Sequence, residues 1–433
     1  MLPTHYGYVE GRFVMKKTIA VLCTLVCSLL VLLQTAFATS ATVATSEDYR
    51  ALGYPDGRKL VRDSAGNEYM AYRKKDSVSG LYQVYVSKST NGGTTWADTN
   101  GGKPISTVTG GDHQRVPSIA IDSHNTLHVV WYGTDSTYNG TDERQIKYSN
   151  STDGGATWTA WRNIAPVSGY SGQVYWEEHP VIYIDGTDNI YIVWEGQDST
   201  YSTNQQTKFI KSTDGGATFT AWKNVYAGGT ATNQSRPTIV VDSTGKIFVI
   251  AYGNYSGTQN IIVSTSTDGG STFSNWSAVS ASTFEQRHPS AAIDSGDKIH
   301  LVWREADSSG KTVIRYSKYI SGAFSAPVSI SPSAGYYQFF PSISNYSGNQ
   351  YVVWTETTDA SGYPSENPAT GKVVYAVKLS GTTTWTKSDL TTYGTNAWAS
   401  IRWSSHRMNG GTVDIVYSSG SASPYSLKYM TLP

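Results

Sequence analysis

One pattern of apolar and polar positions recurs along most of the chain. An apolar, β-branched run is followed by a short polar turn, often containing glycine, and then by a second apolar run. Clear copies occupy 117–132, 180–195, 237–252, 289–304 and 341–355, and fainter copies occupy 58–73 and 400–418. Two such runs around a polar turn are typical of a β-hairpin. The pattern therefore predicts seven hairpins, five clear and two faint.

A second pattern lies between the hairpins. It reads Ser-Thr-Asp-Gly-Gly-x-Thr-aromatic, with Asn in place of Asp in the first copy, and occurs at 89–96, 151–158, 212–219 and 266–273. Paired glycines supply positive φ angles, and an Asp or Asn side chain accepts backbone N–H bonds across a turn. We call these four segments the Asp-Gly turns and expect each to join two strands.

Counting strands predicts the architecture. A hairpin with one strand before and one after each Asp-Gly turn gives four strands per repeat, and self-similarity at this spacing is typical of circular or stacked repeats. Removing 38 N-terminal residues leaves 433 − 38 = 395, or about 56 per repeat for seven repeats, which suits a propeller blade. We predict an all-β β-propeller of four-stranded antiparallel blades, with seven blades favoured and six as the alternative. The seventh repeat ends at Pro433 after three strands, so a strand near residue 39 is expected to close the ring.

The N-terminal 38 residues have the features of a secretory signal peptide. Lys16 and Lys17 precede an apolar run at 19–33, and small residues stand at the cleavage position near Ala38. Met15 begins this pattern and is expected to be the true start. The sequence thus predicts a signal peptide at 1–38, a single propeller domain at 39–433, and secretion to the extracellular space or periplasm.

Both cysteines, Cys23 and Cys27, lie within the predicted signal peptide. Neither follows the small residue that a lipoprotein cleavage site requires, so no membrane anchor is expected. A mature chain without cysteine excludes disulfides, thiolate catalysis and cysteine metal sites.

Composition narrows the classes of partner. Lys and Arg total 33, Asp and Glu total 33, and charged residues make up 15% of the chain, compared with roughly 25% in ordinary soluble proteins. A chain without net charge lacks the basic surface that nucleic-acid binding needs. We therefore expect no nucleic-acid partner, and we also expect a monomer with no cofactor and no metal.

The Asp-Gly turns resemble the Asp-box, or BNR repeat, of the sialidase superfamily. The resemblance covers most of the mature chain as repeats, and it implies a β-propeller with the boxes between the third and fourth strands of each blade. The box also occurs in propellers without sialidase activity, so it marks the fold rather than the reaction.

Candidate chemistry gathers on the face opposite the Asp-Gly turns. Because successive strands alternate in direction, loops leading into first strands and loops leaving second strands share that face. The candidates in these loops are Arg115, Asp135, Trp176, Glu178, Arg236, Glu285, Arg287, Arg304, Tyr337 and Glu356. Arginine is suited to carboxylates through paired hydrogen bonds, and closely placed acids suit proton transfer.

The sialidase resemblance implies a role for each candidate. Arg115, Arg236 and Arg287 would hold a sugar carboxylate, with Arg304 as a substitute. Tyr337 would be the nucleophile with Glu178 or Glu285 as its partner, Asp135 the acid/base, and Glu356 a support for an arginine. Trp176 and Trp398 are candidates for sugar stacking. The chain departs from the family in having Gln114 before Arg115, in placing Arg115 in the second repeat, and in favouring seven units where sialidases have six.

Structural interpretations stand beside these roles. Arg115, Arg236 and Arg287 recur near a proline and are equally consistent with struts between blades. His179 and His288 precede prolines and are interpreted as packing or hydrogen-bonding residues. The tryptophans that end the second strands are expected in the core: Trp131, Trp194, Trp303 and Trp354.

The sequence predicts a secreted, sialidase-like glycoside hydrolase acting on terminal acidic sugars. One alternative is a non-catalytic propeller that binds a glycan or a protein. Another is a polysaccharide lyase acting on uronate polymers, because Arg, His and Tyr also suit proton abstraction beside a neutralised carboxylate.

Overall fold

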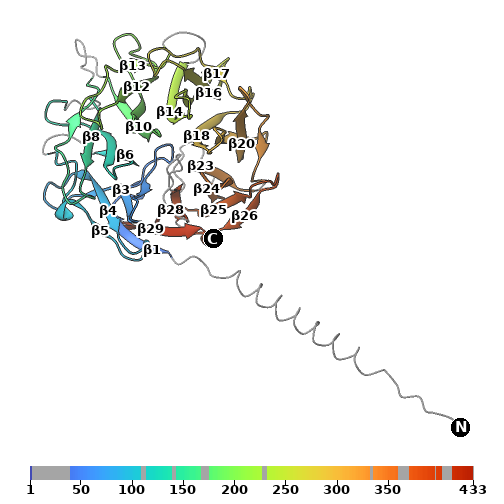
Figure 1. The fold of residues 1–433 in the computed structure, drawn as a ribbon, viewed down its shortest axis with the longest axis horizontal. Coiled ribbons are helices and arrows are strands. Elements are labelled where there is room, and N and C mark those ends of the chain that lie inside the picture. The colour runs from blue at the N-terminus through green and yellow to red at the C-terminus, as the bar shows by residue number, and fades with distance from the viewer. Residues whose placement is uncertain are drawn as a thin grey trace. The chain divides into compact units, whose positions relative to one another are not determined.

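The fold is a seven-bladed β-propeller. The computed structural model describes Met1 and residues 40–108, 114–138, 143–166, 175–226, 232–331, 335–358, 370–394, 396–401 (backbone only) and 412–432. Seven antiparallel sheets surround a central axis, with the first strand of each sheet toward the axis (Figure 1). Seven blades are confirmed over six. The predicted signal peptide, residues 1–38, lies outside the described residues apart from Met1.

The blades follow one another along the chain. Blades one to three are β2–β5 (Leu60–Arg62, Glu68–Lys75, Tyr82–Ser89, Ala97–Asp98), β6–β9 (Arg115–Ile121, Leu127–Gly133, Gln145–Ser151, Arg162–Asn163) and β10–β13 (Glu177–Ile184, Ile190–Gly196, Gln206–Ser212, Lys223–Asn224). Blades four to six are β14–β17 (Thr232–Val241, Ile247–Tyr255, Thr258–Ser266, Ser277–Ala278), β18–β21 (Gln286–Ile293, Ile299–Ala306, Thr312–Ile320, Ala323–Phe324) with β22 (Val328–Ser329), and β23–β26 (Tyr337–Tyr346, Asn349–Thr357, Lys372–Lys378, Thr386–Asp389). A short 3-10 helix, η1, spans Asn100–Gly102.

The seventh blade combines both ends of the domain. Strands β27 (Asn396–Ile401), β28 (Val413–Ser419) and β29 (Tyr425–Leu432) come from the C-terminal end, and β1 (Ala41–Ser46) supplies the fourth strand. Ala41 pairs with Tyr429, and Ser46 pairs with Tyr425. The strand expected near residue 39 is therefore β1.

The core lies between neighbouring sheets. Trp131, Trp194, Trp303 and Trp354 are each 0% exposed, as the hairpin pattern predicted. Burial of such large apolar side chains supplies most of the driving force that packs the blades. Among the described residues, no helix is long and apolar enough to cross a membrane.

The Asp-Gly turns hold their shape through their own side chains. In the second copy, Gly155 N–H donates to Ser151 Oγ at 2.9 Å, and Thr157 N–H donates to Asp153 Oδ1 at 2.9 Å. The other three copies repeat both bonds, with Asn91 in place of Asp in the first. The bond to the Asp or Asn side chain is the one that the sequence pattern predicted.

Strand pairing places the two sets of loops at opposite ends of each sheet. In blade two, Arg115 pairs with Tyr132 at one end of the hairpin, while Leu127 pairs with Ser151 at the other. Asp153 follows Ser151, so its turn lies at the end opposite Arg115. The candidate residues and the Asp-Gly turns therefore lie on different faces.

Candidate functional site

Five inner strands share a strained bulge before their proline. Register shifts interrupt the pairing of β6, β10, β14, β18 and β23 at this point. The residue before each proline has a φ between 47° and 56°: Val116, His179, Arg236, His288 and Phe340. Positive φ is uncommon outside glycine, and such strain gathers at functional sites. We call these five the bulge residues.

Tyr54 lies among the bulge residues. It belongs to residues 47–59, the segment between β1 and β2. Its ring centroid is 5.3 Å from that of His179, 5.7 Å from that of His288 and 5.7 Å from that of Phe340. The guanidinium carbon of Arg236 lies 3.6 Å from the Tyr54 centroid. The segment before the first blade therefore contacts four inner strands. Tyr54 lies outside the repeats, so no periodic signal identified it.

Two residues that follow Tyr54 in the same segment, Arg58 and Lys59, hydrogen-bond to the surrounding blades. Arg58 donates to Ser342 Oγ at 2.7 Å and to the carbonyls of Ala291 and Ile343 at 2.8 Å. Lys59 Nζ donates to the Pro117 carbonyl at 2.6 Å. Burial lowers the pKa of Arg58 to about 10 and that of Lys59 to about 7. These bonds tie the segment to blades two, five and six.

His179 and Glu195 form a hydrogen-bonded pair within blade three. His179 Nδ1 lies 2.7 Å from Glu195 Oε1, and Glu195 Oε2 accepts the N–H of Arg236 at 2.6 Å. Burial first, and Arg236 second, hold the pKa of His179 well below its usual value, so the ring is neutral at pH 7. With Nδ1 donating to Glu195, Nε2 carries the lone pair of a base.

The carboxylates beside this pair also have partners. Glu178, His179 and Glu195 present ligand atoms within 4.8 Å of one another, as a cation would require. Glu178 is ion-paired with Arg144, however, and one oxygen of Glu195 accepts the Arg236 N–H. These hydrogen bonds and the ion pair hold the side chains around His179 in place.

The three predicted arginines are not equivalent in the structure. Arg115 pairs with Tyr132 and Arg287 with Arg304, but in blade four it is Ser235 that pairs with Tyr252. Arg236 therefore occupies the bulge position, one residue later than the other two.

Arg236 interacts electrostatically with tyrosines of blades two and four, Tyr132 and Tyr252. Burial and then Glu178 raise the pKa of Tyr132, while Arg115 and Arg236 act in the opposite direction. Arg236 also interacts electrostatically with Tyr252, whose ring lies 5.7 Å from the Arg287 guanidinium carbon. Arg236 Nη1 is buried without a hydrogen-bond partner in the described part of the chain. It is thus suited to receive a carboxylate.

Asp135 occupies a repeated structural position. It is 2% exposed, is ion-paired with Lys147 and accepts from Asn163 Nδ2 at 2.9 Å. Burial opposes its ionisation, but these hydrogen bonds outweigh that effect and lower its pKa. Asp198 repeats the arrangement in blade three with Lys208 at 2.6 Å and Asn224 at 3.0 Å. The repetition indicates a structural ion pair.

Glu285 and the arginines of blade five bind one another. Glu285 bonds Arg287 at 2.9 Å and Arg304 at 3.1 Å, and Arg304 is 0% exposed. Arg287 also donates to Gln259 Oε1 at 2.6 Å. For Arg287, which reaches Gln259 of blade four, these contacts fit the interpretation as a strut between blades.

Three further candidates, Glu356, Tyr337 and Trp176, also contact other residues of the protein. Glu356 is 0% exposed and accepts from Lys387 at 2.6 Å and Gln338 at 3.0 Å. Tyr337 is half-buried, with Lys311 Nζ 3.8 Å from its ring centroid. Trp176 is half-buried, and its carbonyl accepts Gln197 N–H at 3.1 Å. The side chain of Trp398 lies outside the described residues.

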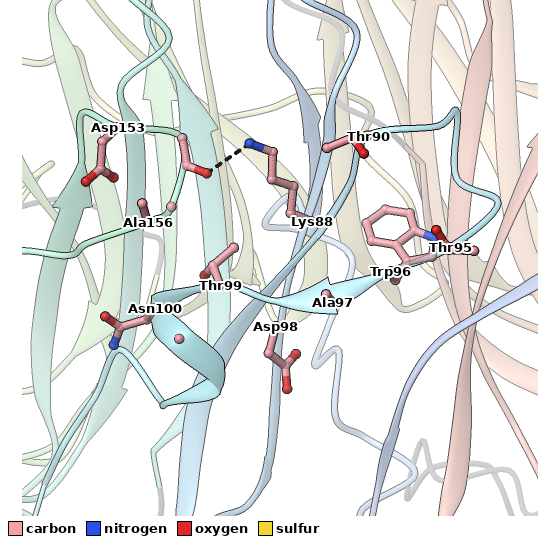
Figure 2. Close-up of a pocket in the computed structure, with 13 residues that line it drawn as sticks. Lys88, Thr90, Thr95, Trp96, Ala97, Asp98, Thr99, Asn100, Asp153 and Ala156 are labelled. Carbon is pink, nitrogen blue, oxygen red and sulfur yellow. Dashed lines mark hydrogen bonds between the residues drawn. The ribbon is translucent and has the colours of Figure 1, made fainter.

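The opposite face carries a groove between two Asp-Gly turns. Its volume is about 440 Å³, and its lining includes Lys88, Trp96, Asp98 and Asp153. Figure 2 shows Lys88 directed toward the Gly154 carbonyl, which it bonds at 3.3 Å. Its lining contains neither histidine nor arginine. The His179–Glu195 pair and Arg236 lie at the other face.

Comparison with known proteins agrees with the fold. Residues 125–338 match a family described as a BNR repeat-like domain. No curated protein matches the chain. A solved polysaccharide lyase of family PL25, an ulvan lyase, has a TM-score of 0.59 at 10% identity, covering 91% of this chain and 96% of its own.

Two further structures are similar at comparable levels. The polysaccharide lyase Uly1 has a TM-score of 0.54 at 12% identity, covering 88% of this chain and 90% of its own. A Hadza microbial sialidase, Hz136, has a TM-score of 0.51 at 15% identity, covering 83% of this chain and 74% of its own. At these identities the likeness establishes a shared propeller fold. Residues 125–338 are therefore similar to a BNR repeat-like domain, within a β-propeller fold.

Proposed function

We propose that this protein is a polysaccharide lyase that cleaves uronate-containing chains by β-elimination. The observation that carries the proposal is the neutral His179, oriented by Glu195 and lying beside Arg236. Abstraction of a proton next to a carboxylate needs an unprotonated base, such as neutral histidine, and a cation that neutralises the carboxylate. Solved propellers of similar fold include an ulvan lyase bound to a glucuronate-rhamnose sulfate disaccharide unit.

The reaction assigns a role to each group. Arg236 pairs with the uronate carboxylate, and His179 Nε2 removes the proton from the adjacent ring carbon. The released electron pair forms a carbon–carbon double bond as the bond to the neighbouring sugar oxygen breaks. Tyr132, protonated because its pKa is raised, donates a proton to that oxygen. Return of the proton from His179 to Tyr132 through water completes the cycle.

The contacts favour this reaction over sialidase-like hydrolysis. Hydrolysis would use Tyr337 as nucleophile and Asp135 as acid/base. Lys311 lies over the ring of Tyr337, and Asp135 is buried in an ion pair with Lys147. Glu178 and Glu285, the predicted partners of the nucleophile, are themselves paired with arginines.

Product chemistry tests the proposal. The purified protein is incubated with glucuronate, galacturonate and mannuronate polymers, with a neutral arabinan and with a fluorogenic sialoside. We expect ultraviolet absorbance of an unsaturated uronate from at least one acidic polymer and none from arabinan. New reducing ends without that absorbance, or sialoside turnover, would establish hydrolysis instead. Binding without any product would identify a non-catalytic propeller.

We also propose that the protein works outside the cytoplasm. The support is the basic, apolar and small-residue order of residues 15–38. N-terminal sequencing of the exported protein should give a start near Thr39. An intact N-terminus on a cytoplasmic protein would refute secretion.

A further inference from the structure

The segment before the first blade supplies an aromatic partner to Arg236. The guanidinium carbon lies 3.6 Å from the Tyr54 ring centroid, a close cation–π distance. Tyr54 also stacks on His288 with an interplanar angle of 10°. This one ring therefore contacts the bulge residues of blades four and five.

Residues before and after Tyr54 in the sequence pack closely against blade two and fix its position. A Cβ on Gly53 would come within 2.8 Å of Val116 Cγ1, and a Cβ on Gly57 within 2.9 Å of Ser118 Cβ. Arg58 and Lys59 anchor the following residues to three blades. The segment is fitted so closely that Tyr54 is in place before any ligand arrives.

Arg236 is held at its backbone and at its side chain. Its N–H bonds Glu195 Oε2 at 2.6 Å, and Tyr54 lies against its guanidinium. A guanidinium donates only in its own plane, so a ring against its face leaves the edge for hydrogen bonds. Nη1 has no partner in the described part of the chain.

We propose that Tyr54 is a positioning residue that orients Arg236 toward the carboxylate of an acidic sugar. The segment 47–59 is then part of the sugar-binding site, and it also holds blades of the propeller together. This inference rests on the proposed function in taking a uronate as the ligand.

Binding of sodium glucuronate, which has no glycosidic bond to break, tests the inference apart from catalysis. Calorimetry compares the wild type with Tyr54→Leu, Tyr54→Phe and Arg236→Lys. We expect about tenfold weaker binding for Tyr54→Leu and Arg236→Lys. Tyr54→Phe should recover most of the affinity because its ring remains. Combining Tyr54→Leu with Arg236→Lys should weaken binding little beyond either change alone, since both act on one contact.

Controls separate this role from general destabilisation. Tyr319 packs on Phe248 and Lys246 at the far end of the sheets, so Tyr319→Leu should leave glucuronate affinity unchanged. Methyl glucoside, which lacks the carboxylate, should bind wild type and Tyr54→Leu alike. On a cleaved polymer, Tyr54→Leu should raise KM more than it lowers kcat.

Each outcome is decisive for one proposal. Glucuronate binding that weakens in Tyr54→Leu, with no unsaturated product from any polymer, would refute the lyase and leave the role of Tyr54 standing. Equal glucuronate affinity of Tyr54→Leu and wild type would overturn that role whatever the activity. Failure of the wild type to bind glucuronate would overturn it as well.

Discussion

His179 Nδ1 lies 2.7 Å from Glu195 Oε1, joining the two innermost strands of blade three at their site end. Burial holds the pKa of this histidine well below its usual value. A neutral imidazole with one nitrogen committed to a carboxylate presents the other as a base. The φ of 55° at His179 is shared in kind by the other four bulge residues, so it belongs to the repeated bulge.

Replacing His179 should abolish the elimination step. We expect His179→Ala to lower kcat by about 10²- to 10⁴-fold, the usual contribution of a general base. Glu195→Gln should cause a smaller loss of kcat, because the His179 ring remains in place but the hydrogen bond that orients it is weaker. His124 is exposed at the opposite face, so His124→Ala serves as the matched control. Initial rates of product absorbance measure all three, and full activity in His179→Ala would remove it from the mechanism.

The pH profile follows from the state of His179. Its folded pKa lies well below the usual value, and the base acts when unprotonated. The rate should therefore rise with pH through that low pKa and stay level across neutral pH. A profile of kcat/KM on a uronate polymer checks this. A rate that still climbs steeply around pH 7 would contradict a neutral, buried base.

Asp135 should matter for stability and not for the reaction. Asp135→Asn breaks a buried ion pair with Lys147, at a cost of about 3 kcal/mol in the free energy of unfolding. Asp198→Asn should cost a similar amount, since Asp198 makes the same contacts with Lys208 and Asn224. Urea unfolding measures both. A large loss of kcat in folded Asp135→Asn, absent in Asp198→Asn, would restore the acid/base role.

Adjacent glycines of the third Asp-Gly turn should respond differently to alanine. Gly215 and Gly216 have φ of 68° and 84°, so both substitutions incur backbone strain of about 1 kcal/mol. A Cβ on Gly216 would also overlap the Tyr148 hydroxyl, whereas one on Gly215 meets nothing within 4 Å. Gly216→Ala should thus cost about 1–3 kcal/mol more than Gly215→Ala. Equal unfolding midpoints for the two variants would show that Tyr148 moves away from the added Cβ of residue 216 without a cost in stability.

Lys59 should make stability depend on pH. Burial lowers its folded pKa from 10.5 to about 7, so between these values the unfolded chain binds a proton that the folded chain does not. Stability from this group is therefore lost as pH falls from 10.5 toward 7, at about 1.4 kcal/mol per pH unit.

Comparison with Lys59→Met isolates that effect. The stability of the variant relative to wild type should decrease by about 1.4 kcal/mol per unit from pH 7 to pH 9. Lys75 is exposed, and Lys75→Met should show no such trend. A constant difference for Lys59→Met would mean that Lys59 stays charged in the fold.

The residues of the site were partly visible in the sequence. Tyr132 and Glu195 end predicted second strands, and Glu178 and Arg236 lie where the chain enters predicted first strands, so their common face could be inferred. Their roles could not, because a one-residue bulge places Arg236 at the position of His179 and His288 rather than that of Arg287. Aligning the repeats on their prolines would have grouped Arg236 with His179 and His288.

The repeats alone predicted a propeller with seven blades favoured over six, the order of strands and the face of each loop, because these depend on local alternation and turn chemistry. The three-dimensional packing decided which side chains meet. Tyr54 contacts Arg236 although 182 positions (236 − 54) separate them in the sequence. Closing the ring brings such distant residues together, and no local pattern records which of them touch at the axis.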